Sequence, residues 1–273
     1  MDLPFHAPIS RCHPNCLRAL NAQEDYDASQ RAAMLAVDLI SSARVVFKVD
    51  REYTEYSAQY LVDNAGPKKE SGQGEWEQGR GITMNDLVEY LRDIAIPNQE
   101  GELDQERPVL TVKDCLECAF RDGLPRKGHW GHVGCVSKVP PFASLIPRVP
   151  MKGKVLEAET WEGGVALLEK QPVGAKLHVF SPEIDLVDEG EGVYDGPAGP
   201  GSTYVGLRDV MITGYGKKVA ELRICYKKKS KFIKVSLERV LTSLPKDGEE
   251  PQVIEPTGLL VDFIVPRFKK RRA

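Results

Sequence analysis

Long apolar runs are absent from this chain of 273 residues: no stretch approaches the roughly 18–20 apolar residues that a membrane-spanning helix needs. The opening segment, MDLPFHAPISRCHPNC, lacks a continuous apolar stretch, so we expect no secretory signal. A net charge of -3 excludes a global basic field that would draw the chain to nucleic acid. Six cysteines are too few to form the main framework of a chain this long. We therefore expect reduced thiols, no membrane partner and a cytoplasmic or nuclear location.

The first half of the chain has a helical pattern. Apolar residues recur at steps of three and four from Ser29 to Val49, with Asp27 and Ser29 as plausible caps. Residues 55–63 predict a short helical turn, and residues 64–81 are a polar loop rich in glycine.

Two further segments predict short amphipathic helices. Residues 82–90 and 110–118 each place a threonine three residues before an aspartate, which resembles a capping box, and each is followed by a proline stop. The similarity of these two segments fits either an internal duplication or the residue preferences that amphipathic helices share.

The second half of the chain is rich in predicted strands. Four prolines in residues 137–150 indicate a linker, and residues 162–170 predict a helix. Strands are expected at 152–156, 175–180, 205–214, 221–226, 231–237 and 258–266. Helices followed by strands predict an α+β protein with two lobes. We expect a mainly helical lobe at 27–136 with an insert at about 64–109, a mainly β lobe at 137–266, and a basic tail at 267–273.

Several short phrases occur in a specific order along this chain. They are SAQYLVD at 57–63, QPVG at 171–174, GVYDGP at 192–197, RDVMITGYG at 208–216, and TGLL at 257–260 followed by Val265-Pro266. Together they resemble the papain-like cysteine peptidases. The resemblance covers nearly the whole chain and implies a papain-like two-lobe fold, with a helical N-terminal lobe and an antiparallel, β-barrel-like C-terminal lobe.

The resemblance also implies which residues stand at the family's catalytic positions. The nucleophilic cysteine falls on Ala33, the glutamine of the oxyanion hole on Asp27, and the general-base histidine on Arg208. The asparagine that orients the histidine is missing around Cys225. No cysteine lies between Cys16 and Cys115, so a small shift of register does not restore the nucleophile.

These replacements predict loss of peptidase chemistry. Cysteine peptidases need a thiolate, a base, a group that orients the base, and donors for the oxyanion. An alanine methyl cannot attack a carbonyl, and arginine has no acceptor nitrogen and stays protonated. Asp27 would place negative charge where an oxyanion forms. No catalytic residue is expected to be intact.

We therefore predict a pseudopeptidase that binds a protein or peptide in the groove retained from the family, with His129, Trp130 and Tyr215 as candidate binding residues. One alternative is an active cysteine-type endopeptidase of the same family. A second is a subunit of a larger assembly, held by the insert and the basic tail.

Other clusters favour weaker interpretations. Cys12, Cys16, Cys115 and Cys118 could be zinc ligands, but buried small apolar cysteines are the simpler interpretation, and we expect no metal or other cofactor. A nucleic-acid contact is conceivable only through Lys227–Lys231 or the tail segment Lys269–Arg272. A solvated loop and a solubilising terminus are the simpler interpretations of these two basic runs.

Overall fold

The computed structural model describes residues 24–66, 108–134, 143–187, 192–199, 201–246 and 249–268. Cys12, Cys16, most of the predicted insert, the helix predicted at 82–90 and the tail segment Lys269–Arg272 lie outside these ranges. The described residues form two compact units. The first contains residues 24–37, 54–66, 108–134 and 143–152, and the second contains residues 38–53 and those from 153 to 268.

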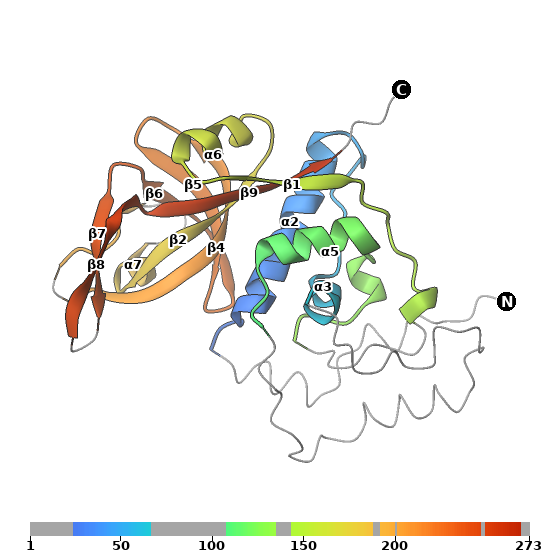
Figure 1. The fold of residues 1–273 in the computed structure, drawn as a ribbon, viewed down its shortest axis with the longest axis horizontal. Helices are drawn as coiled ribbons and strands as arrows, with labels where there is room; N and C mark the ends of the chain where they lie inside the picture. Colours follow the sequence, from blue (N-terminus) through green and yellow to red (C-terminus); the bar gives the residue numbers. More distant parts are fainter. Residues whose placement is uncertain are drawn as a thin grey trace, which may run out of the picture. The chain divides into compact units, whose positions relative to one another are not determined.

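Helix α2, Ala28–Val46, confirms the predicted first helix and contributes to both units (Figure 1). Asp27 caps it, as expected: the backbone N–H of Gln30 donates to Asp27 Oδ1 at 2.8 Å, and the backbone N–H of Asp27 donates to Gln30 Oε1 at 3.2 Å. The helix ends three residues before the predicted Val49. The chain leaves it through Lys48, whose φ of 55° lies in the left-handed region.

The first unit also contains two shorter helices. Helix α3, Ala58–Asn64, begins where the Oγ of Ser57 accepts a hydrogen bond from the Tyr60 N–H. Helix α5, Val112–Asp122, begins with the capping box predicted for Thr111 and Asp114. It ends at Gly123, whose φ of 74° favours glycine. The 3-10 turns η2, Lys127–His129, and η3, Ala143–Leu145, follow along the chain.

The second unit is built on a seven-stranded sheet with the order β1-β9-β2-β4-β5-β6-β3. Its strands are β1 Gly153–Ala158, β2 Val173–Ser181, β3 Val193–Tyr194, β4 Thr203–Tyr215, β5 Val219–Tyr226, β6 Lys229–Ser236 and β9 Leu260–Phe268. All of the paired strands are antiparallel except β3 and β6, which are parallel. Helices α6, Trp161–Leu168, and α7, Glu183–Leu186, complete this part of the unit.

Six of these strands confirm the expected strands, and α6 confirms the expected helix. The last predicted strand was placed about two residues too early, and β9 includes Arg267 and Phe268, which were predicted to begin the basic tail. Strands β3, β7 (Val240–Lys246) and β8 (Glu249–Gly258) were missed. Strands β7 and β8 pair only with each other, as a separate two-stranded sheet. Proline breaks the apolar pattern in both of these strands, which is typical of edge positions.

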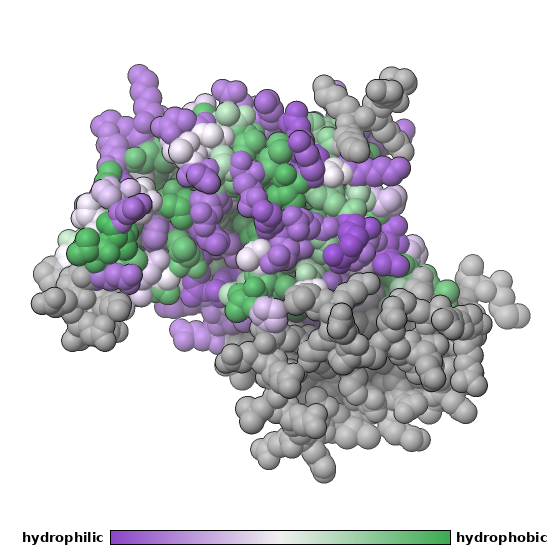
Figure 2. Space-filling view, in the orientation of Figure 1, coloured by the Kyte–Doolittle hydropathy of each residue, from purple (hydrophilic) through white to green (hydrophobic). Residues whose placement is uncertain are grey.

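One face of the large sheet forms the core of the second unit. The cluster of buried side chains includes Val173, Ala175, Leu177, Val210, Ile212, Leu222, Ile224, Ile233, Val235 and Phe263. Helix α6 packs close to this cluster, since a Cβ added to Gly164 would lie 2.8 Å from the ring of Phe263. Figure 2 shows hydrophilic residues interspersed with smaller hydrophobic areas over the described surface in that view.

Residues 38–46 of α2 pack on the sheet. A Cβ added to Gly174 of β2 would lie 2.8 Å from Leu39 Cδ1, which shows how closely helix and sheet approach. An ion pair joins Asp38 to Arg223 of β5. Arg44 forms a second ion pair with Asp50, at 2.7 Å, and its guanidinium lies 5.8 Å from the ring centre of Phe268.

Candidate functional site

The resemblance to papain-like peptidases assigns the nucleophile position to Ala33, which is a core residue. Ala33 lies in α2 with no exposed surface, flanked by the buried Ala32 and Ala36. A buried methyl group can fill space but cannot form a covalent bond with a substrate. Asp27, to which the resemblance assigns the oxyanion-hole position, is exposed, and its carboxylate caps α2.

The resemblance assigns two further catalytic positions to residues on neighbouring strands of the second half. Arg208 is half-buried in β4, with its guanidinium 5.6 Å from the ring centre of Tyr226. Cys225, the residue before Tyr226 in β5, is half-buried and opposite Ser230 of β6. The residue that the resemblance assigns to the histidine position is therefore a cation beside an aromatic ring, and this cation cannot accept a proton.

The two cysteines of α5 are buried. Cys115 and Cys118 form no disulfide and are 0% and 1% exposed. Burial, reinforced by the Asp122 carboxylate, raises the pKa of the Cys118 thiol to about 12. The thiolate is the reactive and metal-binding form, so the raised pKa and the burial of Cys118 both disfavour its reaction near neutral pH.

Helix α3 is the centre of a polar network in the first unit. Asp63 accepts hydrogen bonds from Gln59 Nε2 at 2.8 Å and from the indole Nε1 of Trp130 at 2.9 Å. Gln59 Oε1 in turn accepts from the backbone N–H of Gly134 at 2.6 Å. These hydrogen bonds connect residues 130–134 to α3.

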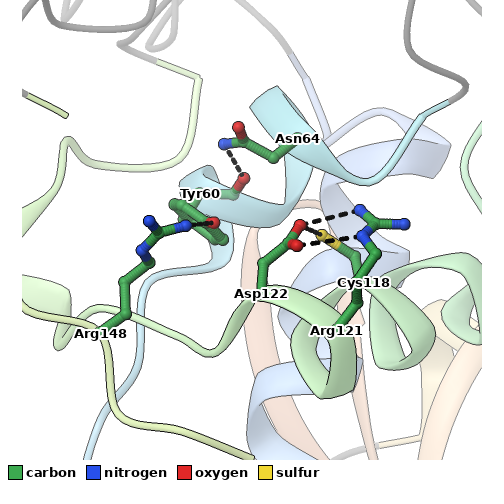
Figure 3. A network of polar contacts seen from close by, with 6 residues as sticks. All are labelled: Tyr60, Asn64, Cys118, Arg121, Asp122 and Arg148. Carbon is green, nitrogen blue, oxygen red and sulfur yellow. Dashed lines mark hydrogen bonds and ion pairs between the residues drawn. The ribbon is translucent and has the colours of Figure 1, made fainter. Parts of the chain in front are cut away.

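Tyr60 connects α3 to a second segment (Figure 3). Its hydroxyl accepts a hydrogen bond from Arg148 at 3.0 Å, and its carbonyl accepts one from Asn64 Nδ2 at 2.7 Å. Burial raises the pKa of the Tyr60 hydroxyl, and Arg148 opposes that rise. Figure 3 also shows Asp122 bound by Arg121 and contacted by the Cys118 thiol at 3.6 Å. These contacts have the character of a structural framework, because each charge or amide is matched by another group of the chain.

The three predicted binding residues occupy different environments. Trp130 is only 2% exposed, and its ring lies edge-on to Tyr60 with 5.1 Å between the ring centres, so it is part of the packing of the first unit. His129 is half-buried at the end of η2 in that unit. Tyr215 belongs to the second unit, is 47% exposed and meets Trp161 edge-on at 6.2 Å. Of the three, Tyr215 is the most accessible to a partner.

Sequence reasoning missed the framework around α3. Asp63, Gln59 and Arg148 were not singled out, although the spacing of four residues between Gln59 and Asp63 places both on one face of a helix. Their distant partners, Trp130 and Gly134, carry no local sequence signal for this pairing.

The basic run Lys227–Lys231 is partly engaged within the second unit. Lys227 forms an ion pair with Asp185 of α7 at 2.9 Å and lies 5.2 Å from the ring centre of Tyr226. The Lys231 ammonium donates to the carbonyls of Ile184 and Val187, each at 2.8 Å. Two cations of the run thus stabilise the segment around α7.

The described residues contain neither a cluster of metal-binding side chains nor a membrane-spanning helix. No group of three or more histidine, cysteine, aspartate or glutamate side chains there could hold a metal ion. No helix in the described part of the chain is long and apolar enough to cross a membrane.

Comparison with known proteins identifies the family. A family model described as the HEAT-INDUCED TAS1 TARGET N-terminal domain matches residues 5–152, more than half of the chain. The chain belongs to this family. Protein HEAT-INDUCED TAS1 TARGET 1 of Arabidopsis thaliana is 54% identical over 273 residues, covering 97% of this chain and 96% of the relative. Protein HEAT-INDUCED TAS1 TARGET 4 of the same plant is 55% identical over 267 residues, with 94% of each chain covered.

Solved structures show the fold of this chain. A cysteine protease of Carica candamarcensis is similar with a TM-score of 0.51 and 13% identity, covering 96% of this chain and 99% of that chain. Recombinant stem bromelain precursor is similar with a TM-score of 0.50 and 11% identity, covering 98% of this chain and 74% of that chain. These likenesses confirm the papain-like α+β fold.

Proposed function

We propose that this protein is a papain-like scaffold without peptidase activity that binds a protein or peptide partner. The observation that carries the proposal is Ala33, a buried methyl group at the position where the resemblance places the nucleophile. Arg208 supports it, because a guanidinium stacked on Tyr226 cannot act as a general base.

A noncovalent role follows from what the chain keeps and what it replaces. The core of the sheet and the framework around α3 are fully packed, whereas the positions for nucleophile, base and oxyanion donor carry groups of the wrong chemistry. A scaffold of this kind can still contribute binding surface. Tyr215 is the candidate contact, because an exposed tyrosine supplies a large amphipathic surface at low cost in side-chain entropy.

A protein or peptide is favoured over nucleic acid as the partner. Lys227 and Lys231 already hold α7 and the residues after it, which reduces the cationic charge that the run offers to phosphates. A cytoplasmic or nuclear location is part of the proposal, because reduced thiols are typical of these compartments.

Two assays on the full chain test the two parts of the proposal. In the first, a fluorogenic peptide mixture is incubated with the reduced protein. We expect no hydrolysis above the rate in buffer alone. Hydrolysis that a thiol-directed inhibitor blocks would support the alternative hypothesis of an active endopeptidase.

The second assay is affinity purification of the tagged chain from native plant extract, compared with two variants. We expect a specific partner to be recovered with the wild type and with Phe232→Ala, an exposed aromatic control at 54% exposure. Recovery should fall with Tyr215→Ala. A partner retained equally by both variants would place the contact elsewhere, and a wild-type chain that never recovers a partner would overturn the binding role. A partner recovered in fixed stoichiometry would favour the alternative of an assembly subunit.

A further inference from the structure

The hairpin that joins β5 to β6 carries a serine directly after three consecutive lysines. Lys227 and Lys228 form the turn, and Lys229 begins β6. Ser230 is the second residue of β6 and is exposed. A hydroxyl group is therefore presented next to the basic tip of a hairpin.

The turn of this hairpin is strained by the residues that form it. Lys227 and Lys228 both have a positive φ, of 49° and 58°. This is the pattern of a two-residue type I′ turn, in which glycine or asparagine is usual, and other residues there cost roughly 1–2 kcal/mol each. The strain lowers the free energy needed to separate the pairs nearest the tip. Ser230 belongs to the second of those pairs, after the pair of Tyr226 with Lys229.

Strand β6 is also open on the side away from β5. Strand β3 pairs with that side only at Lys234 and Val235. Among the described strands, none pairs with that side of residues 229–233. The backbone around Ser230 is therefore already extended, and another protein can reach it from the edge of the strand.

The lysines that precede Ser230 can contact an acidic recognition surface. Lys229 is exposed. Lys227 forms an ion pair with Asp185, but these side chains are 45% and 35% exposed, so the pair contributes at most about 1 kcal/mol and can be exchanged for another carboxylate. Lys231 binds carbonyls near α7, so recognition depends on the residues before the serine.

We propose that Ser230 is a phosphorylation site for a serine/threonine kinase that selects basic residues on the N-terminal side of its target serine. ATP is the phosphoryl donor. A bond forms between Ser230 Oγ and the γ-phosphorus, the bond from that phosphorus to the oxygen bridging the β- and γ-phosphates breaks, and ADP leaves. The hydroxyl proton passes to the catalytic aspartate of the kinase.

The sheet offers a cation to the phosphate that this reaction adds. Cys225 lies directly opposite Ser230, so Arg223, two residues earlier in β5, is diagonal to it. A long side chain can reach a group at that spacing. Phosphate pairs well with a guanidinium group, and Arg223 already forms an ion pair with Asp38 of α2. The phosphate and the Asp38 carboxylate therefore compete for one cation.

Phosphorylation of the reduced, folded full chain in vitro tests the site. The protein is incubated with ATP, Mg²⁺ and a purified kinase of this selectivity, and peptide mapping by mass spectrometry locates the phosphate. The Ser71→Ala background removes the other serine that has lysines two and three residues before it. We expect about one phosphate per chain, on Ser230, and none there in Ser230→Ala.

Two pairs of substitutions test recognition by the lysines. Lys227→Gln combined with Lys228→Gln should lower kcat/KM for phosphorylation of Ser230 by roughly tenfold. Lys217→Gln combined with Lys218→Gln, at the exposed turn between β4 and β5, is the matched control and should leave it unchanged. Thermal unfolding of each variant checks that the fold is intact.

A synthetic peptide of residues 225–233 separates the sequence from its setting in the fold. We expect the kinase to phosphorylate both the peptide and the folded chain. Phosphorylation of the peptide alone would show that the hairpin withholds Ser230, and failure with both would show that the run of lysines is not recognised. Either result, or equal rates for the two double variants, would overturn the proposal.

Discussion

The indole Nε1 of Trp130 donates a hydrogen bond to Asp63 Oδ2 at 2.9 Å, across 67 residues of sequence. The contact joins a tryptophan that the sequence favoured as a ligand-binding residue to the last turn of α3. Since Trp130 is almost fully buried, its polar N–H needs an acceptor inside the protein. The pair therefore accounts for both residues as parts of the fold.

Asp63→Ala should destabilise the first unit by about 1–3 kcal/mol. The substitution removes the acceptor of the Trp130 indole and of the Gln59 side chain, and buried donors that lose a partner carry their desolvation cost. Denaturant unfolding monitored by tryptophan fluorescence measures the change. Glu117→Ala, an exposed acidic residue on α5, is the control and should shift the unfolding free energy by less than about 0.5 kcal/mol. Equal effects of the two variants would contradict the account.

Gly123→Ala should destabilise the protein by about 1–3 kcal/mol. Gly123 has a φ of 74°, and an added Cβ would lie 2.8 Å from the backbone oxygen of Val149, which cannot move without breaking its hydrogen bond to the Leu124 N–H. Gly128→Ala is the matched control, because nothing lies within 4 Å of its added Cβ. Thermal unfolding of both variants checks the difference. A stable Gly123→Ala would show that the turn after α5 can adopt another backbone path.

Stability should fall as the pH drops below the usual histidine range, in part because of His178. Burial lowers the pKa of His178 from its ordinary value of 6.5, and the Asp262 carboxylate only partly offsets this. The unfolded chain then binds the proton more tightly than the folded chain, so stability is complete above about pH 6.5 and is lost as the pH falls through the folded-state pKa. Its Nδ1 lies 2.9 Å from the Tyr204 hydroxyl. The unfolding free energy measured from about pH 8 to pH 5 should slope less in His178→Gln than in the wild type. An identical slope would refute this assignment.

Cys118 should resist alkylation in the folded protein at pH 8. Its pKa of about 12 leaves very little thiolate, and it is almost fully buried. Cys225, which is half-buried in β5, is the internal comparison and should react faster. Peptide mapping after a timed exposure to iodoacetamide gives both rates, and unfolding the chain should equalise them. Rapid modification of Cys118 in the folded state would mean that α5 opens or that its thiol is activated.

Much of the fold could be predicted because its signals are local. The stripe of α2, the cap at Asp27, the Thr111–Asp114 capping box and the six longer strands of the sheet all appear in short windows of sequence. Strands β7 and β8 were not predicted, because prolines interrupt their apolar pattern. Strand β3 was not predicted because it has only two residues.

The site was less predictable, because its contacts are nonlocal. The ring of Trp130 and the amide of Gly134 meet α3 from more than sixty residues away, and no spacing rule foretells those contacts. Lys231 shows the same limit. A run of lysines indicated a solvated loop or an anionic partner, whereas its ammonium binds carbonyls near α7, and that role depends on tertiary structure alone.

We propose above that this papain-like chain lacks a competent nucleophile. The most direct measurement is the intact mass of the reduced, folded protein after incubation with an irreversible peptidyl epoxide, with an active papain-like peptidase treated in parallel. The account predicts an unchanged mass, because Ala33 cannot react and Cys118 is protonated. Stoichiometric addition of one inhibitor to a cysteine of the folded chain would contradict it.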